Sequence, residues 1–212
     1  MTPVGAIQSF CRQWSAVRTI WPDRPDELTV EGVCTFPRIV RGVELIKPAQ
    51  PGDRDDLRLE LTIRKLAGAA KGMPQTHFAR YEERPRRPYK TVTIVPASLT
   101  IPVESTVPCE RLRATLSPPG GFVDVAATFL VPLGGYQVAL RRAEPQGWNP
   151  KDLWLQVHVT EPDGPTEKQP VKRVASYKEE SHIVYETVTI LPNNVTAAVE
   201  LTPSPPDPSE PE

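Results

Sequence analysis

Apolar and polar residues alternate along several short stretches of the chain. The first is 57–63, with apolar residues at every odd position and Arg58, Glu60 and Thr62 between them. The stretch 153–159 has apolar residues at its odd positions too, with Trp154, Gln156 and His158 between them. A period of two places one side-chain set in a core and the other in solvent, as in a half-buried β-strand. On this basis we predict about six strands in each half: 28–36, 41–47, 56–65, 76–83, 88–95 and 98–105, then 122–131, 135–142, 152–160, 172–179, 184–191 and 194–202.

The second half of the chain resembles the first. Residues 89–96 read Tyr-Lys-Thr-Val-Thr-Ile-Val-Pro, and residues 185–192, which lie 96 positions later, read Tyr-Glu-Thr-Val-Thr-Ile-Leu-Pro. Upstream the offset is 93, because three residues are gained in the second copy around 147–150. Such a gain is typical of a surface loop, since an insertion inside a strand would reverse its faces. The sequence therefore predicts an internal duplication.

Each copy is expected to end in a hairpin. In the first copy, runs at 91–95 and 99–103 flank Pro96-Ala97-Ser98, and in the second the separator is Pro192-Asn193-Asn194. Proline and asparagine favour tight turns. The expected inward residues of the first hairpin are Val92, Ile94, Leu99, Ile101 and Val103.

The N-terminal segment has a different period. Thr2-Pro3 is a plausible helix start, and large apolar residues follow at spacings of three and four: Ile7, Phe10, Trp14, Val17 and Trp21. This spacing predicts an amphipathic helix that Pro22 ends. Its apolar stripe would either cap the first unit or dock on a neighbouring subunit.

The predicted fold class is thus all-β: two tandem antiparallel β-sandwich or small-barrel units with one short N-terminal helix. We divide the chain into an N-terminal arm (1–27), a first repeat (28–106), a linker (107–121), a second repeat (122–202) and a tail (203–212). The tail is acidic and rich in proline, and is expected to be disordered or extended.

The composition of the chain indicates which cellular compartment and which kinds of partner to expect. The net charge is −1, so we do not expect nucleic acid or an anionic membrane to be attracted. No signal peptide or membrane-spanning run is apparent, which predicts a protein of the cytoplasm or of a virion assembled there. The three cysteines, Cys11, Cys34 and Cys109, are expected to be free thiols.

No catalytic or metal-binding motif stands out, and we predict no enzyme activity, metal or cofactor. Asp53, Asp55 and Asp56 could suggest calcium, but the second copy keeps only Asp152. The acids shared by both copies could form carboxylate pairs for a hydrolase. We interpret them instead as fold requirements, because a duplicated catalytic site is seldom needed.

The candidate contact residues are those that differ between the copies. They comprise the helix stripe Phe10, Trp14, Val17 and Trp21, the basic residues Arg84, Arg86 and Arg87, and Trp148 and Trp154. The basic loop could meet the acidic loop 176–186 of another subunit. The tryptophans could anchor a partner or stack on a sugar.

The function expected from this pattern is non-enzymatic. We predict a structural or assembly protein that contacts itself or other structural proteins, such as a capsid-decorating or tail protein of a virion. The alternative is a carbohydrate- or protein-binding module that uses the surface tryptophans, with a glycan as one candidate ligand.

Overall fold

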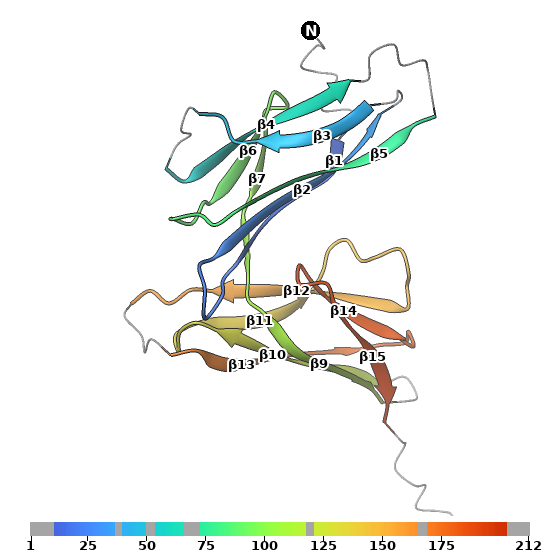
Figure 1. Cartoon of the computed structure of the whole chain (residues 1–212). Coiled ribbons are helices and arrows are strands. Elements are labelled where there is room, and N and C mark those ends of the chain that lie inside the picture. The colour runs from blue at the N-terminus through green and yellow to red at the C-terminus, as the bar shows by residue number, and fades with distance from the viewer. Residues whose placement is uncertain are drawn as a thin grey trace, which may run out of the picture. The chain divides into compact units, whose positions relative to one another are not determined.

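The computed structural model describes residues 11–36, 40–49, 54–65, 73–117, 121–164 and 169–202. All regular elements in these ranges are strands, which confirms the all-β prediction (Figure 1). The first eight are β1 (Cys11–Thr19), β2 (Glu27–Phe36), β3 (Val40–Ile46), β4 (Asp56–Lys65), β5 (Gln75–Glu83), β6 (Thr91–Val95), β7 (Leu99–Pro102) and β8 (Glu104–Thr106). The other seven are β9 (Cys109–Leu116), β10 (Phe122–Val131), β11 (Gln137–Arg142), β12 (Asp152–Thr160), β13 (Val171–Glu180), β14 (Thr187–Leu191) and β15 (Val195–Leu201).

The chain divides into two compact units. Unit 1 comprises the chain up to Thr19 together with Pro25–Ser105, and unit 2 comprises Ile20–Arg24 and the chain from Thr106 onward. The short segment Ile20–Arg24 thus belongs to unit 2 although residues on either side belong to unit 1.

Unit 1 is a sandwich of two four-stranded sheets. One sheet has the order β5-β2-β1-β8 and the other β3-β4-β6-β7 (Figure 1). Alternate residues of the facing strands form the core, which includes Leu28, Val30, Leu57, Leu59 and Ile94. The alternation in the sequence has this origin, because each strand has one face on the core and one in solvent.

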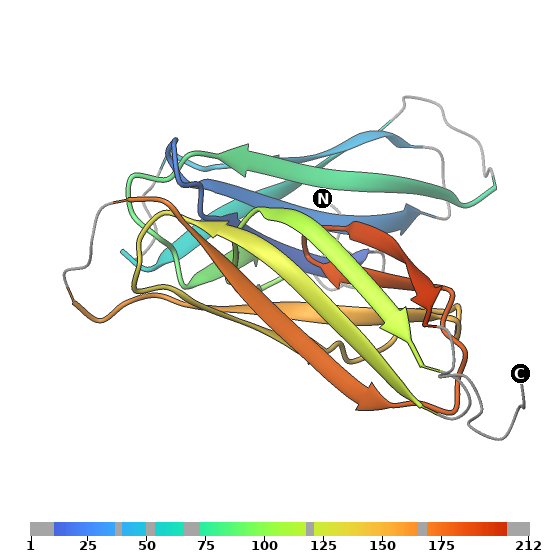
Figure 2. The same cartoon turned by 90° about the horizontal axis from the view of Figure 1, so that it is seen from below.

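Unit 2 is a single seven-stranded sheet of order β11-β12-β14-β15-β9-β10-β13 (Figure 2). Its end strands, β11 and β13, are in contact, so the sheet is nearly closed like a barrel. Phe129, Leu153, Leu155 and Ile190 are among its most buried side chains. A curled sheet lets one face supply the whole core.

The two units use the same order of strand pairings. β4 pairs in parallel with β6 from Asp56 opposite Thr91, and β12 pairs in parallel with β14 from Asp152 opposite Thr187. The hairpins β6–β7 and β14–β15 are antiparallel and follow these pairs, with Val92 opposite Ile101 in the first. The predicted hairpins are confirmed, whereas the expectation of purely antiparallel units is wrong. The sequence shows which residues alternate but not which strands become neighbours.

The predicted N-terminal helix is wrong for the described part of this segment. Cys11–Thr19 is strand β1, hydrogen-bonded in an antiparallel ladder to β2, while residues 1–10, including Phe10, lie outside the described residues. An irregularity between Arg12 and Ser15, with Gln13 at a φ of 54°, shifts the register within the strand. This shift breaks the period of two and produces the helix-like spacing of Trp14 and Val17. Pairing with β2 overrides the local pattern.

A further strand occupies the expected linker 107–121. Its residues 109–116 form β9, which pairs with β10 and, in parallel, with β15. Val107, Ala114 and Leu116 are buried in the core of unit 2. β9 thus has the place in unit 2 that β1 has in unit 1, beside β10 and β2 respectively. The expected tail, 203–212, lies outside the described residues.

Two of the three cysteines are joined, which corrects the expectation of three free thiols. Cys11 in β1 lies opposite Cys34 in β2, and the two form a disulfide. Cys109 is free. The sequence did not reveal this pairing. Cys11 lies in the segment predicted to be a helix, so it was not expected beside the strand that contains Cys34.

Candidate functional site

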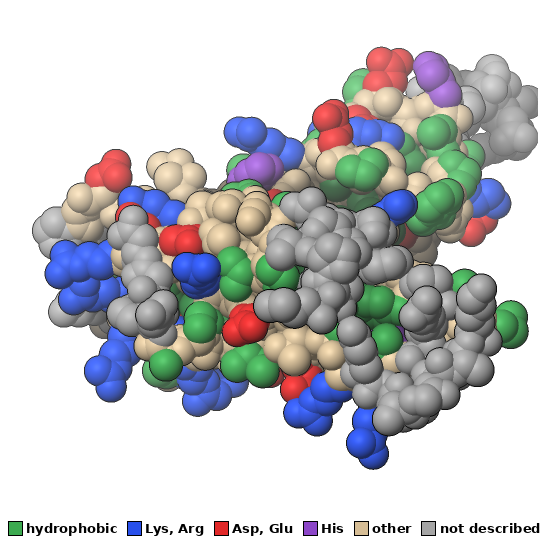
Figure 3. Space-filling model, turned by 90° about the horizontal axis from the view of Figure 1, so that it is seen from above, with side chains coloured by type: hydrophobic (Ala, Val, Ile, Leu, Met, Phe, Trp, Pro, Cys, Tyr) green, Lys and Arg blue, Asp and Glu red, His purple; other side chains and the backbone are tan. Residues whose placement is uncertain are grey.

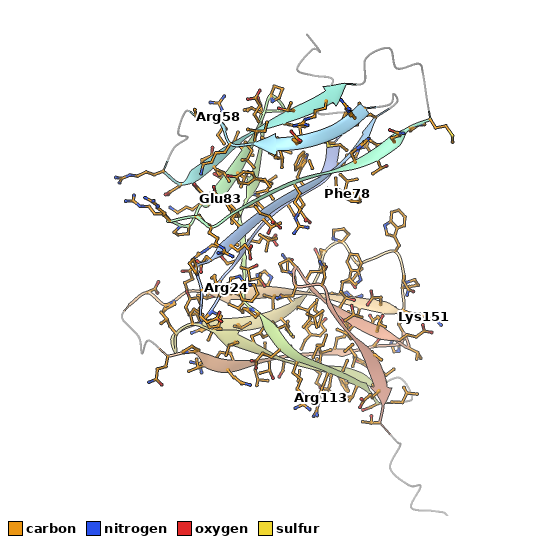
Figure 4. The ribbon with its side chains drawn as sticks, in the orientation of Figure 1. Arg24, Arg58, Phe78, Glu83, Arg113 and Lys151 are labelled. Carbon is orange, nitrogen blue, oxygen red and sulfur yellow. A yellow bond between two sulfur atoms is a disulfide. The ribbon has the colours of Figure 1, made fainter. Side chains whose placement is uncertain are left out.

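Each unit contains a half-buried network of one cation, one glutamate and two tyrosines. In unit 1, Lys47 donates to Glu83 Oε2 at 2.8 Å and to the Tyr89 hydroxyl at 3.1 Å, and Tyr81 donates to Glu83 at 2.7 Å. Lys47 follows β3, Glu83 ends β5 and Tyr89 precedes β6, so the network joins the two sheets; Figure 4 marks Glu83. These side-chain hydrogen bonds hold the two sheets together at this position.

Unit 2 has the matching network around Glu179. Arg142 donates to both carboxylate oxygens at 2.6 Å, Tyr177 donates to Oε2 at 2.5 Å and Tyr185 to Oε1 at 2.9 Å. The two glutamates are 96 positions apart, which is the offset noted in the sequence. A single guanidinium nitrogen of Arg142, Nη1, reaches both oxygens. In unit 1, where lysine is present, Glu83 Oε1 is left buried without a partner.

These contacts shift the pKa values of the groups involved. Burial alone would raise the pKa of Glu179, but hydrogen bonds from Arg142, Tyr177 and Tyr185 outweigh it and lower the pKa below its usual range. The pKa of Glu83 is lowered in the same manner, against burial, chiefly by Lys47 and Tyr81. Burial and the hydrogen bond to Glu179 raise the pKa of Tyr177 to about 12. The charged glutamate and neutral tyrosine are thus the stable forms, as in a structural ion pair.

Replacing Glu179 with glutamine is expected to flatten the acid dependence of stability. Because its pKa is lower in the folded state, Glu179 stabilises the fold above the unfolded value of about 4.3, and this contribution is lost as pH falls through the folded value. Glu179→Gln should reduce the free energy of unfolding at pH 7 by about 1 kcal/mol and weaken its decline between pH 5 and 3. Urea unfolding at several pH values measures this. Exposed Glu180→Gln is the control, and equal effects of the two changes would refute the assignment.

The second set of repeated acids also ties strands together. Asp56 accepts hydrogen bonds from Thr91 at 2.8 Å and Thr93 at 3.0 Å, and Asp152 does the same for Thr187 and Thr189. Both aspartates begin a strand that runs parallel to the one bearing the threonines. These contacts explain the repeated Asp and Thr-Val-Thr pattern as requirements of the parallel pair.

The three arginines of the basic loop lie together at one groove. Arg84, Arg86 and Arg87 are in the connection between β5 and β6, and they line a groove of about 480 Å³ with Pro25, Asp26, Pro85 and Pro88. All these residues belong to unit 1. Asp26 is already paired with Arg18, whose Nε donates to it at 2.7 Å. This arginine groove is the one candidate site from the sequence whose residues the structure brings together.

The tryptophans do not form a common surface. Trp14 packs against the core of unit 1 over Gly32, where an added Cβ would come within 2.3 Å of its ring. Trp21 carries Arg24 over its ring at 3.6 Å. Trp148 is 100% exposed, whereas the ring of Trp154 lies under Gly147 of the same loop. The half-buried Val17 belongs to β1.

The covering of Trp154 is fixed by hydrogen bonds that the sequence did not reveal. Its indole nitrogen donates to Asp152 at 2.6 Å, and its backbone amide donates to the Gln146 side chain at 3.0 Å. Gln146 donates back to the Trp154 carbonyl at 2.9 Å. The inserted loop is therefore a cover for this tryptophan, and of the two candidate residues in this region Trp148 alone is fully exposed.

Acidic and basic side chains are interspersed on the face shown in Figure 3. Within the described ranges, no group of three or more His, Cys, Asp or Glu side chains could hold a metal ion. No helix in the described part of the chain is long and apolar enough to cross a bilayer. Comparisons with protein-family models, curated proteins and solved structures found no match.

Proposed function

We propose that the protein is a non-enzymatic structural or assembly protein that arose by internal duplication and acts through protein–protein contacts. The observation that carries this proposal is a pair of exposed apolar residues at matching positions. Phe78 in β5 is 76% exposed, and Val174, 96 positions later in β13, is 67% exposed. Phe78 projects from its strand in Figure 4.

Both residues lie on strands at the end of a sheet. β5 ends one sheet of unit 1, and β13 ends the sheet of unit 2. β5 is hydrogen-bonded to β2 and also contacts β3, and β13 is hydrogen-bonded to β10 and also contacts β11. A large exposed aromatic side chain is a frequent anchor of an interface with another chain. The combination supports association with further copies or with other subunits of a larger assembly.

The repeated polar residues support a non-enzymatic role. Glu83, Glu179, Asp56 and Asp152 are all engaged by side chains that tie strands together. A nucleophile or general base must instead be available to a substrate. If the fold was duplicated, the hydrogen bonds that hold its strands together were duplicated with it. This explains why both copies keep the four acidic residues.

A virion component, such as a capsid-decorating or tail protein, is the class of assembly that we favour. Two β units with proline-rich connections suit a part that is exposed on a particle. The Cys11–Cys34 disulfide favours such an oxidising location over the cytoplasm. The alternative, a glycan- or protein-binding module, now depends on Trp148 alone, because Trp154 is covered.

Replacing Phe78 with serine tests the proposal. If Phe78 is buried in an interface, Phe78→Ser should raise the dissociation constant of the oligomer about 10- to 100-fold, from the loss of one buried aromatic side chain. Light scattering after size exclusion, at several protein concentrations, gives the mass. Leu201→Ser is the control, since Leu201 is 62% exposed at the end of β15. Equal masses for the three proteins would contradict an interface at Phe78.

A further inference from the structure

The arginine groove carries unsatisfied positive charge. Arg84, Arg86 and Arg87 are exposed, and within the described ranges none of them forms a hydrogen bond or ion pair. The nearby acid, Asp26, is held by Arg18. Several other basic residues of the unit are paired, such as Lys90 with Asp55 at 2.7 Å. The groove therefore offers three free guanidinium groups for an anionic ligand.

The residues that line the groove indicate which chemical class of ligand would fit it. Pro25, Pro85 and Pro88 contribute apolar rings to the same lining as the arginines. Proline also removes backbone donors that a phosphate site would use. A ligand that places apolar rings and carboxylates side by side would match this surface better than a compact inorganic anion.

The chain itself contains a segment of that chemistry. Residues 203–212 read Pro-Ser-Pro-Pro-Asp-Pro-Ser-Glu-Pro-Glu. A polyproline II helix repeats every three residues with a rise of about 3.1 Å. In that conformation Pro205, Pro208 and Pro211 would share one edge, and Asp207 and Glu210 would share another, about 9 Å apart.

We propose that the arginine groove binds segment 203–212 of a second copy of the chain. The proline edge packs on Pro25, Pro85 and Pro88, and the acidic edge pairs with the arginines. The binding cost is small for this kind of segment, because a proline-rich chain already favours the extended conformation. The groove of one copy and the segment of another are two different surfaces of the chain, so identical chains would join head to tail.

This inference rests on the proposed assembly function and names one of its contacts. A head-to-tail contact uses two different surfaces of each chain, so it can be broken from either side. It can also be rebuilt between two variants that are each defective on one side only. These properties give a test that general loss of solubility or folding cannot imitate.

The experiment is a charge exchange followed by sedimentation velocity. The groove variant is Arg84→Glu/Arg86→Glu/Arg87→Glu, and the tail variant is Asp207→Lys/Glu210→Lys/Glu212→Lys. Each alone should associate about tenfold or more weakly than the unmodified chain. An equimolar mixture should recover association, because unlike variants form both the reversed pair and the unmodified pair. Recovery should weaken between about 50 and 500 mM salt. Far-ultraviolet circular dichroism checks that the exposed substitutions leave the fold intact.

The outcomes separate this inference from the wider proposal. If the chain forms an oligomer that neither variant changes, assembly stands and the tail contact is overturned. The tail contact is also overturned if the mixture does not recover association. If a fluorescent peptide of residues 202–212 binds the full chain but all proteins stay monomeric, binding in trans between copies is overturned. A monomeric chain that does not bind the peptide at millimolar concentration refutes both the contact and self-assembly.

Discussion

Phe129→Ala should destabilise unit 2 by about 3–5 kcal/mol. Phe129 is 0% exposed in β10 and is among the largest fully buried side chains in the described part of the chain. Its removal loses transfer free energy and leaves a cavity in a sheet that supplies its core from one face. A loss of this size approaches the whole stability of a small domain. Urea unfolding, followed by circular dichroism, measures the change.

Phe122 provides the matched control for this experiment. It starts the same strand but is 45% exposed, and Lys178 lies over its ring at 4.7 Å. Phe122→Ala should therefore cost about 1 kcal/mol or less. Because Phe129 belongs to the core of unit 2, the transition of unit 1 should not move. Equal losses for the two alanine variants would show that the inward face of β10 has been assigned wrongly.

Removing the disulfide should cost unit 1 about 3 kcal/mol, since a cross-link of this length limits the unfolded chain by about that amount. Cys11 and Cys34 are separated by 23 positions. The prediction applies to Cys34→Ser and to reduction of the unmodified chain, both followed by urea unfolding. Cys109→Ser is the control, because Cys109 is free.

A thiol titration provides an independent check of the pairing. The unmodified chain, denatured without reductant, should contain one reactive thiol, and after reduction it should contain three. Three thiols before reduction would show that β1 and β2 are not cross-linked. A loss of stability in Cys109→Ser as large as in Cys34→Ser would contradict the specific role of the pair.

The strands could be predicted from sequence wherever alternation was continuous. The stretch that includes Leu57, Leu59 and Leu61 forms β4, and the predicted hairpins are present with Val92 and Ile94 inward. Prediction failed at β1, where the irregularity at Gln13 interrupts the alternation, and where inward-facing Arg18 looks polar in sequence but is buried with Asp26. Parallel pairing and the Cys11–Cys34 bond depend on contacts between distant segments, which no local pattern encodes.

The candidate site could be predicted only in part, because some of its residues are adjacent in sequence and others meet only in the fold. The cluster of Arg84, Arg86 and Arg87 is local in sequence, so its basic character was visible, whereas Pro25 joins it only through the fold. Trp154 was expected to be exposed because its strand neighbours alternate, but its own loop folds back over the ring. The sequence did not show that Lys47 and Arg142 are equivalent. They lie where the offset between the two halves changes, so an alignment of the halves does not pair them.

The function proposed for this protein depends on association through its surface. The most direct test is sedimentation equilibrium of the unmodified, oxidised chain over a hundredfold range of concentration. We expect a mass that is a multiple of one chain, or that rises with concentration toward such a multiple. A mass that stays at one chain throughout the range would contradict self-assembly.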